Sequence, residues 1–306
     1  MKIAIIGSGI AGLTCAYLLN RRHAISLFEA GDWVGGHTHT VDVRVDGRDY
    51  AIDTGFIVFN DWTYPNFIRL LDRLGVASRA TEMSFSVRDP HSAVEYNGNN
   101  LNSLFAQRSN LVSPPFWGML RDILRFNREA LADLGSGRLD AHVTLGDYLQ
   151  RGGYGSRFIE HYIVPMGAAI WSTDAAMMLA FPARSFIDFY ANHGMLQAVG
   201  RPAWRTVTGG SKTYIDRLLE DGDIESAVDT PVRRIGRTPA CVPLEDAQGI
   251  VRMFDHVVIA THADQALELL AAPTQKEQAL LATFAYERNH AVLHRDKRFM
   301  PRRRRL

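Results

Sequence analysis

Cysteine is scarce in this 306-residue chain, and its scarcity excludes two kinds of structure. The two cysteines, Cys15 and Cys241, cannot supply a disulfide framework, and their separation matches no metal-ligand spacing. Cys15 falls within a predicted helix, where a thiol packs as a small apolar side chain. The cysteine content agrees with a reducing compartment and predicts no thiolate metal site.

Long apolar runs and an excess of one charge are also missing. No uninterrupted apolar segment is long enough to span a bilayer, so no transmembrane segment is expected. The formal net charge of +1 gives no general attraction to nucleic acid or anionic membranes, and we expect no nucleic-acid partner. The basic cluster within 301–305 is predicted to be a solvated end. With 46% apolar and 22% charged residues, the composition is typical of a soluble globular protein, and we expect a cytoplasmic one.

The most informative pattern that the chain does have lies in its first twelve residues. A short apolar run, Lys2–Ile6, leads without a gap into a G-x-G-x-x-G segment, and Leu13–Leu19 then reads as a helix. This order is typical of the first half of a dinucleotide-binding βαβ unit. Gly7 permits a tight turn, Gly9 lets backbone approach a pyrophosphate, and Gly12 lets the helix lie close to the sheet. The helix start offers N–H groups and the positive end of its dipole to phosphates.

A carboxylate follows at the distance expected for a ribose contact. Ala24–Phe28 is a second strand-like run that ends at Glu29, 17 residues beyond Gly12, close to the roughly 20 typical of an acid that binds a ribose hydroxyl. The alternative is a glycine turn in an ordinary α/β protein with an acid at a strand end. The order of strand, turn, helix, strand and acid favours the dinucleotide interpretation.

After Glu29 the chain departs from the usual course of a nicotinamide dehydrogenase, which would enter a helix here. Residues 30–38 instead form a loop that ends in Gly35-Gly36, and such a pair lets backbone pass next to a bulky flat ligand. At this point the sequence resembles the flavoprotein family of amine oxidases, protoporphyrinogen oxidases and phytoene-type desaturases, and within it a bacterial NAD/FAD-binding subgroup. In that family Arg often follows the glycine pair, whereas this chain has His37, and neutral His cannot replace a permanent bidentate cation.

Further segments extend the resemblance over most of residues 1–300. Ala51–Phe59 resembles the family's D-x-G strand near the flavin, and Val207–Ser211 precedes a predicted helix, 212–219, as the family's second Gly-Gly segment does. Thr230–Ile235 resembles the strand whose valine backbone faces the adenine, and His256–Thr261 the returning strand of the cofactor sheet. The motif and the resemblance together imply that FAD is bound by Gly7, Ser8, Gly9, Ile10, Ala11, Gly12, Glu29, Ala30, Gly35, Gly36, His37, Thr38, Gly55, Phe56, Val232 and Ala260.

The predicted fold is α/β, with a discontinuous Rossmann-like FAD-binding domain at 1–75 and 205–272. Residues 76–204 read as a mostly helical insert, which in the family covers the flavin and forms much of the substrate pocket. Its predicted elements are a helix beginning at Ser113-Pro114-Pro115, a capping box at Thr144–Asp147, a helix from Ser156 to Trp171 kinked or broken at Pro165, and a hairpin turn at Asn97–Asn100 between Ser84–Val87 and the run near Leu101.

The last part of the chain lacks glycine, since none occurs after Gly249. The resemblance implies a late glycine motif that touches the flavin's phosphate and ribityl chain. Phe284–His294 is predicted to be a strand, so residues 273–306 are expected to begin a substrate-domain sheet. We expect a C-terminally incomplete member of the family; the alternative is that another segment does the work of the missing motif.

No residue is assigned here as a catalytic acid or base. In flavin chemistry the cofactor accepts the hydride equivalent, so such a group is not required. His37 and His39 would share a face of an extended strand but lack a third metal ligand, so no metal is predicted. Asp174, Tyr190 and His193 read as helix ends and satisfied polar groups. Most of the insert's aromatic residues are expected in the core rather than around an apolar pocket: Trp171, Phe181, Phe186, Tyr190 and Trp204.

The favoured function is a FAD-dependent oxidoreductase that takes a hydride equivalent from a C–N or C–C bond. Its substrate would be a small amine or an apolar, lipid-like molecule. Two alternatives stay open: an NAD(P)-dependent dehydrogenase with the same fingerprint, and a non-catalytic or vestigial dinucleotide-binding protein. The oligomeric state stays open as well.

Overall fold

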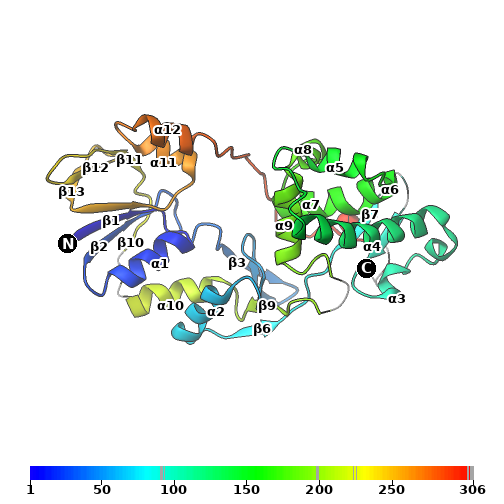
Figure 1. The fold of residues 1–306 in the computed structure, drawn as a ribbon. Coiled ribbons are helices and arrows are strands. Elements are labelled where there is room, and N and C mark those ends of the chain that lie inside the picture. The colour runs from blue at the N-terminus through cyan, green and yellow to red at the C-terminus, as the bar shows by residue number, and fades with distance from the viewer. Residues whose placement is uncertain are drawn as a thin grey trace. The chain divides into compact units, whose positions relative to one another are not determined.

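The computed structural model describes residues 1–89, 92, 94–197, 200–222, 224, 226–301 and 303, which form two compact units (Figure 1). Unit 1 comprises Met1–Phe59, Pro65–Thr81 and Arg205–Leu293. Unit 2 comprises Asn60–Tyr64, Glu82–Trp204 and the described residues of His294–Leu306. The assignment of cofactor and substrate binding to separate domains stays a prediction.

A parallel sheet forms the centre of unit 1, and it confirms the predicted α/β fold. Its described strands have the order β10-β2-β1-β14 and span Ser226–Ala227, Ala24–Phe28, Lys2–Ile6 and His256–Ile259. Four of the five residues of β1 are buried, as expected for a parallel strand covered on both faces. The predicted strand, turn, helix and strand are all present, with α1 at Ile10–Leu19.

Helices cover one face of the parallel sheet, and an antiparallel sheet covers the other (Figure 1). On the helical face, α1 packs against α10 (Lys212–Gly222), which also contacts α2 (Pro65–Leu74). On the other face, Ala4, Ile6 and Phe28 share a core with the second sheet, whose strands are β11 (Val232–Ile235), β12 (Val242–Asp246) and β13 (Val251–Phe254). Removal of both faces from water stabilises this arrangement. Helices α11 (Ala263–Leu269) and α12 (Gln275–Leu281) complete unit 1.

The predicted strand Ala51–Phe59 is shorter in the structure. β3 (Thr40–Val45) pairs with β4 (Arg48–Asp53), and the next strand residues are β5 (Phe59–Asn60). β4 ends at Asp53, although the N–H groups of Thr54 and Phe56 donate to the carbonyls of His39 and His37 (3.0 Å each) in continuation of the same register. A Cβ atom at Gly55 would lie close to the His37 carbonyl oxygen. The remaining strands of this region are β6 (Ser78–Ala80) and β9 (Trp204–Val207), which pair with each other.

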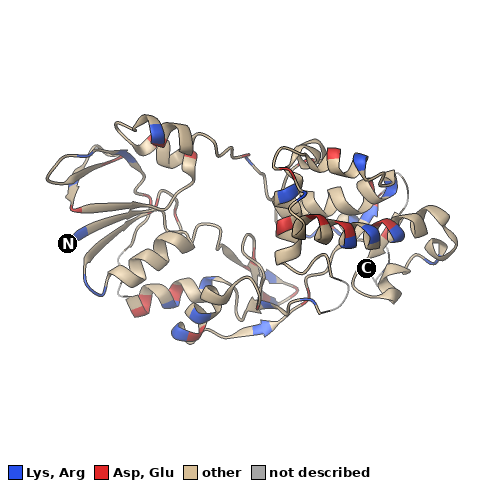
Figure 2. Cartoon of the chain, in the orientation of Figure 1, with Lys and Arg blue, Asp and Glu red and all other residues tan. Residues whose placement is uncertain are grey.

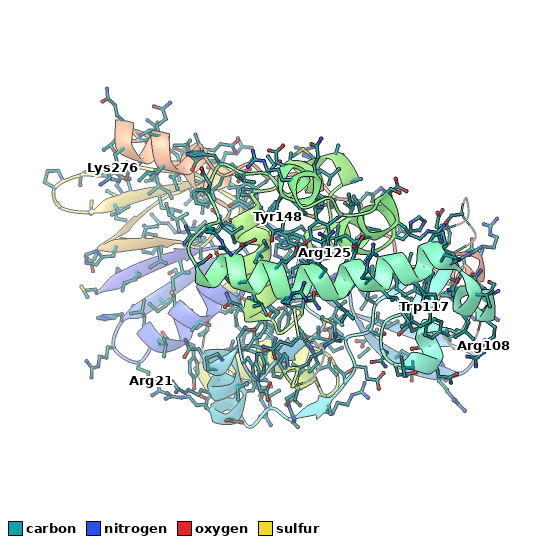
Figure 3. All side chains as sticks on the ribbon, turned by 45° about the vertical axis from the view of Figure 1, so that its right-hand side comes forward. Arg21, Arg108, Trp117, Arg125, Tyr148 and Lys276 are labelled. Atoms are coloured by element: carbon teal, nitrogen blue, oxygen red, sulfur yellow. The ribbon has the colours of Figure 1, made fainter. Side chains whose placement is uncertain are left out.

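Unit 2 is mostly helical, as predicted for this segment. Its main helices are α4 (Pro114–Gly135), α5 (Leu145–Arg151), α6 (Ser156–Phe158), α7 (Val164–Trp171), α8 (Ala175–Ala180) and α9 (Ala183–Asn192). They enclose a core that includes Phe126, Phe158 and Phe186. Ser113 is the N-cap of α4 as predicted, and the hydroxyl of Thr144 caps α5 by accepting the N–H of Asp147 (3.1 Å). Near the start of α4, the indole of Trp117 donates to the carbonyl of Leu111 in the 3-10 segment Arg108–Val112 (Figure 3).

Pro165 widens its helix rather than breaking it. A π-helical turn, Ile159–Ile163, joins α6 to α7 without a gap. Proline has no N–H to donate to the carbonyl four residues earlier, which belongs to His161. The hydroxyl of Tyr96 donates to that carbonyl instead (2.6 Å), so the group stays satisfied.

The predicted hairpin turn at Asn97–Asn100 is wrong. β7 (Ser86–Asp89) pairs with β8 (Val94–Asn97), so the connection that closes the hairpin lies before β8, and of its residues only Ser92 is described. The run near Leu101 is the short helix α3 (Leu101–Leu104). Asn100 is its N-cap, because its side chain accepts the N–H of Ser103 (3.0 Å) while the hydroxyl of Ser103 accepts the N–H of Asn100 (3.1 Å).

The predicted strand Phe284–His294 is also wrong, because residues 284–296 have no regular secondary structure. Phe284, Val292 and Leu293 are exposed, and no described strand pairs with this segment. Aromatic and aliphatic residues form a strand only where a neighbouring strand takes up the backbone groups. Of the basic cluster, Arg303 pairs with Glu95, while Arg302, Arg304 and Arg305 lie outside the described residues. No helix of the described chain is both long and apolar enough to cross a membrane.

Candidate cofactor-binding site

The three glycines of the turn between β1 and α1 have different surroundings. Gly7 has φ +95°, and a Cβ atom there would lie 2.6 Å from the carbonyl oxygen of Ala260. A Cβ atom at Gly12 would lie 1.9 Å from the carbonyl oxygen of Gly7. A Cβ atom at Gly9 would meet no heavy atom within 4 Å. Gly7 and Gly12 are therefore needed by the fold, whereas Gly9 borders open space that a ligand can enter.

The start of α1 offers uncapped backbone donors. Gly9 is the N-cap residue, no side chain caps the helix, and its first turn contains no acidic residue. Ile10 and Ala11 are exposed. The first N–H groups of a helix have no partner within the helix, and its dipole is positive there. This end of α1 can therefore bind an anion such as a diphosphate.

Glu29 holds the glycine-rich turn as well as marking the end of β2. Its Oε2 accepts both the N–H (2.9 Å) and the hydroxyl (2.5 Å) of Ser8, which is fully buried. Its Oε1 accepts the N–H of Gly31 (2.9 Å). A carboxylate has about four acceptor positions, and three are used here. Glu29 is half-buried, and the fourth acceptor position lies on Oε1.

The predicted glycine pair packs directly on this turn. The N–H of Gly35 donates to the hydroxyl of Ser8 (3.2 Å), and Gly35 has φ +130°. A Cβ atom at Gly36 would lie 3.0 Å from Cα of Gly9. The structure thus brings the turn, Glu29 and the Gly35-Gly36 pair together around one hydroxyl group. Ala30, also predicted at this site, is exposed beside Glu29.

Thr38 and Gly55 have structural contacts that explain their residue types. Thr38 is buried, and its hydroxyl bonds that of Tyr214 from α10. A Cβ atom at Gly55 would lie 2.2 Å from the carbonyl oxygen of His37, so only glycine fits there. The ring of Phe56 packs edge-on against Phe67 of α2, with centroids 5.2 Å apart. These positions support the loop that carries the glycine pair.

Ala260 and Val232 lie at different edges of the site. The N–H of Ala260 donates to the carbonyl of Ile6 (2.8 Å), which places Ala260 beside Gly7. Val232 belongs to β11 of the antiparallel sheet. Two residues before it, the N–H of Thr230 donates to the carbonyl of Glu29 (2.9 Å). The chain therefore passes the end of β2 two residues before Val232, which itself pairs with Asp246.

Asp53 was not among the predicted site residues, although it connects two of the motifs. Its Oδ1 accepts the hydroxyl of Thr40 (2.6 Å) and the N–H of Ser211 (2.8 Å), and its Oδ2 accepts the Ser211 hydroxyl (3.0 Å). Ser211 follows Gly209-Gly210, both with positive φ. The D-x-G and Gly-Gly motifs are visible in the sequence, but the hydrogen bonds that join them over 158 residues are not.

The prediction of helix ends and satisfied polar groups in the insert holds for two of its three residues. Asp174 caps α8 by accepting the N–H of Met177 (2.8 Å), and a ring nitrogen of His193 bonds the carbonyl of Phe189 (2.9 Å). The prediction is wrong for Tyr190, which is buried in the aromatic core: burial raises the pKa of its phenol, and its hydroxyl has no partner among the described residues. The ring of Trp171 packs against the rings of Phe181, Phe186, Phe189 and Tyr190. This cluster belongs to the core of unit 2.

The two loop histidines point to different partners. The ring of His39 packs on Trp33, with centroids 4.5 Å apart, whereas that of His37 stacks on His262 at 5.9 Å. In the described part of the chain, no group of three or more His, Cys, Asp or Glu side chains is placed to hold a metal ion.

Together, the parallel sheet, the glycine-rich turn and the acid at the end of β2 define a fold of the Rossmann type. The model of the flavin-containing amine oxidoreductase family matches residues 10–304, and the chain belongs to that family. Membership bears out the resemblance that the glycine motifs indicated, and it implies a flavin cofactor.

Curated relatives match over short segments. Zeta-carotene desaturase of Solanum lycopersicum is 38% identical over 76 residues, which are 24% of this chain and 12% of the relative. The 15-cis-phytoene desaturase of Synechococcus elongatus is 35% identical over 88 residues, which are 28% of this chain and 18% of the relative.

Solved structures match over most of the chain. Putrescine oxidase bound to putrescine superposes with a TM-score of 0.68 at 18% identity, over 92% of this chain and 63% of that one. A conjugated-linoleic-acid-producing fatty acid isomerase from P. acnes gives 0.63 at 17% identity, with the same coverage. At these identities the likeness shows the fold, and the chain spans less than two thirds of the length of these proteins.

Proposed function

We propose that this chain binds FAD and works as a flavin-dependent oxidoreductase. The single observation that carries the proposal is the open space beside Gly9, at the uncapped start of α1. On its two sides the packing is so tight that a Cβ atom at Gly7 or Gly12 would clash with backbone. Because Gly9 has an ordinary φ and open space around it, the fold does not require glycine there. A bound diphosphate does require glycine at this position, because a side chain would occupy the space of the phosphates.

Each part of the site has a task in this proposal. Backbone N–H groups at the start of α1 bind the diphosphate, and the remaining acceptor position of Glu29 takes a ribose hydroxyl. Gly35 and Gly36 let the following loop pass close to the ligand. Asp53 fixes the Gly209-Gly210 turn against β3 and β4. The described residues thus fit the adenosine diphosphate half of the cofactor.

The chemistry that a bound flavin supplies is acceptance of a hydride equivalent from a substrate carbon. We infer that a C–N or C–C single bond would become a double bond: one hydrogen would leave as a hydride equivalent to the flavin and the other as a proton to solvent, and oxygen or another acceptor would take the two electrons. The similar proteins include putrescine oxidase bound to putrescine, a zeta-carotene desaturase and a 15-cis-phytoene desaturase. We therefore propose an amine or an apolar, lipid-like substrate, and we assign its recognition to the helical unit 2.

The test is the visible absorption spectrum of the freshly purified protein, followed by identification of the nucleotide released on denaturation. We expect flavin absorption bands and FAD. Protein purified without cofactor should regain these bands on incubation with FAD and gel filtration. Release of NAD without flavin would favour a nicotinamide-dependent dehydrogenase. Tight FAD binding without photoreduction or reduction by any amine or lipid tested would favour a non-catalytic binder.

A further inference from the structure

Exposed apolar side chains gather in one region of unit 2. Within residues 101–131, six large apolar side chains are exposed: Leu101, Leu111, Val112, Trp117, Leu124 and Leu131. The ring of Trp117 packs on Phe105, with centroids 5.3 Å apart, and its indole N–H donates to the carbonyl of Leu111 (2.9 Å) (Figure 3). These contacts hold the end of α3, the 3-10 segment and the start of α4 together as one surface.

Three of these residues belong to a stripe along the outer side of α4. The stripe consists of five exposed residues: Trp117, Arg121, Leu124, Arg128 and Leu131. At 3.6 residues per turn, they fall within an arc of about 80°. The opposite side of the helix buries Met119, Phe126 and Ala130. A solvent-facing stripe ordinarily carries polar residues, so three large apolar side chains there indicate an interaction surface. We refer to the stripe together with Leu101, Leu111 and Val112 as the α4 face.

The charges of α4 are divided between the stripe and the rest of the helix. The acidic residues of α4 are Asp122, Glu129 and Asp133. They lie about 120–160° around the helix from Trp117. Each accepts a hydrogen bond from another part of unit 2. Arg128 is 78% exposed and lies 3.7 Å from Glu129, and Arg121 forms no ion pair with a described residue. The stripe is therefore apolar and basic, although the net charge of the whole chain is only +1.

The charges beside α3 balance each other. The guanidinium of Arg108, at the same end of α4 as Trp117, donates to the side chain of Asn102 (3.0 Å) (Figure 3). The carboxylate of Glu82 accepts the side-chain N–H of Asn99 (2.9 Å). The excess of positive charge on the α4 face therefore comes from the two arginines of the stripe.

We propose that the α4 face docks on an anionic lipid surface. Its leucine, valine and tryptophan side chains enter the boundary between headgroups and acyl chains, and the two guanidinium groups between them bind lipid phosphates. The indole of Trp117 loses no hydrogen bond there, because its N–H already donates to Leu111. A bilayer offers apolar chains and anionic groups along the whole stripe, whereas a protein partner would need pockets and acids in a matching order. The contact is peripheral, and it does not depend on the proposed cofactor.

The first experiment is flotation of the purified full chain with lipid vesicles on a density gradient. One set of vesicles contains phosphatidylcholine alone, and the other contains in addition about 30% phosphatidylglycerol. We expect the anionic vesicles to bind the protein at least about tenfold more tightly than the neutral ones. Raising the salt concentration from roughly 50 to 500 mM should weaken this binding by about tenfold, because salt screens the two arginines. Equal binding to both sets of vesicles would overturn the proposal.

Two double variants separate the apolar contribution from the ionic one. Val112→Ser with Leu124→Ser removes two exposed apolar side chains, and Arg121→Gln with Arg128→Gln removes the two cations of the stripe. Each double variant should lower the affinity for the anionic vesicles by about tenfold or more. Only the variant that lacks the arginines should lose the dependence on salt. Circular dichroism of each variant checks that the fold is retained.

The matched control is Met177→Ser with Arg184→Gln. Met177 is 51% exposed on α8 and the Arg184 side chain is 58% exposed on α9, so the control removes the same kinds of side chain outside the α4 face. It should bind anionic vesicles with the affinity of the parent. An equal loss in the control, or the parent affinity in both variants of the face, would overturn the proposal. A dimer that does not bind vesicles and that the Val112 and Leu124 substitutions dissociate would assign the face to a second copy of the chain instead.

Discussion

Ser8 and Glu29 are joined by two hydrogen bonds, because the backbone N–H and the hydroxyl of Ser8 both donate to Oε2 of the carboxylate. The same hydroxyl accepts the N–H of Gly35. Glu29 therefore holds the glycine-rich turn in place before any ligand binds, in addition to the ribose contact that we propose for it. Its two roles make different predictions for two substitutions.

Glu29→Gln should weaken FAD binding more than it weakens the fold. The amide oxygen can still accept from Ser8, but the charged acceptor for the ribose is lost, which costs about 1.5–3 kcal/mol of binding free energy. Glu29→Ala should in addition lower the free energy of unfolding by about 1–3 kcal/mol, because the buried Ser8 hydroxyl loses its acceptor. Calorimetric titration and urea denaturation measure the two quantities. Equal unfolding free energies for both variants would contradict the structural role.

Gly9→Ala and Gly12→Ala should show which glycine is needed for FAD binding and which is needed for folding. Gly9 has φ −65°, and a Cβ atom there meets nothing, so the unfolding free energy should change by no more than about 0.5 kcal/mol. FAD affinity should fall by about tenfold or more, since the methyl group takes the ligand's space. Gly12→Ala should destabilise the protein by about 1–3 kcal/mol through the clash with the Gly7 carbonyl. The result that would overturn this assignment is unchanged FAD affinity in Gly9→Ala.

The fold of unit 1 was predictable because its signals are local. Strand, glycine turn, helix and acid follow one another within 29 residues, and each glycine has a backbone task. The contacts that complete the site are not local. Asp53 bonds Ser211, and the ring of His37 packs on that of His262, although each pair is far apart in the sequence. The failed strand at Phe284–His294 has the same explanation. Its aromatic and aliphatic residues are a local signal, but a strand exists only through a pairing that this signal does not specify.

Glu277 should titrate far below an ordinary glutamate. The guanidinium of Arg237 bonds both its oxygens, and the N–H and hydroxyl of Thr274 add two more bonds, which together lower its pKa to about 2. Since the pKa is lowered in the folded state, the stabilisation is complete above the ordinary glutamate value. It is lost as the pH falls through about 2. Carboxyl NMR titration measures the midpoint. Arg237→Gln should raise it, and the exposed neighbour Arg233→Gln should not.

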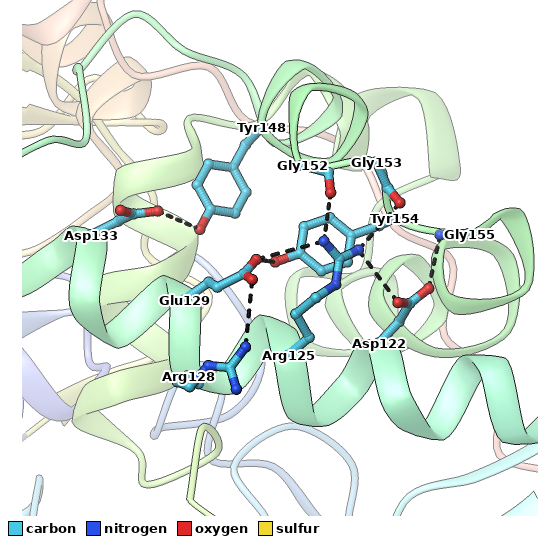
Figure 4. A network of polar contacts seen from close by, with 10 residues as sticks. All are labelled: Asp122, Arg125, Arg128, Glu129, Asp133, Tyr148, Gly152, Gly153, Tyr154 and Gly155. Carbon is cyan, nitrogen blue, oxygen red and sulfur yellow. Dashed lines mark hydrogen bonds and ion pairs between the residues drawn. The ribbon is translucent and has the colours of Figure 1, made fainter.

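Arg125 should contribute more to stability than the other basic residues of α4, a helix that carries both acidic and basic residues (Figure 2). Its guanidinium donates to the carbonyls of Gly152 (2.6 Å) and Gly153 (3.2 Å) and lies 4.0 Å from the ring centroid of Tyr154 (Figure 4). It also pairs with Asp122, which is buried and accepts the N–H of Gly155. Loss of the cation leaves two carbonyls and a buried carboxylate without this partner.

Arg125→Met should therefore lower the free energy of unfolding by about 2–4 kcal/mol in urea denaturation. Arg128→Met is the matched control on the next turn, because Arg128 is 78% exposed and its contact is an ion pair with Glu129 at 3.7 Å. An exposed ion pair of this kind contributes about 0–1 kcal/mol. The hydrogen bonds to the two carbonyls and the contact with the Tyr154 ring depend on the planar guanidinium group. Arg125→Lys should therefore recover less than half of the lost unfolding free energy. Equal destabilisation by the Arg125 and Arg128 variants would show that the network acts only through net charge.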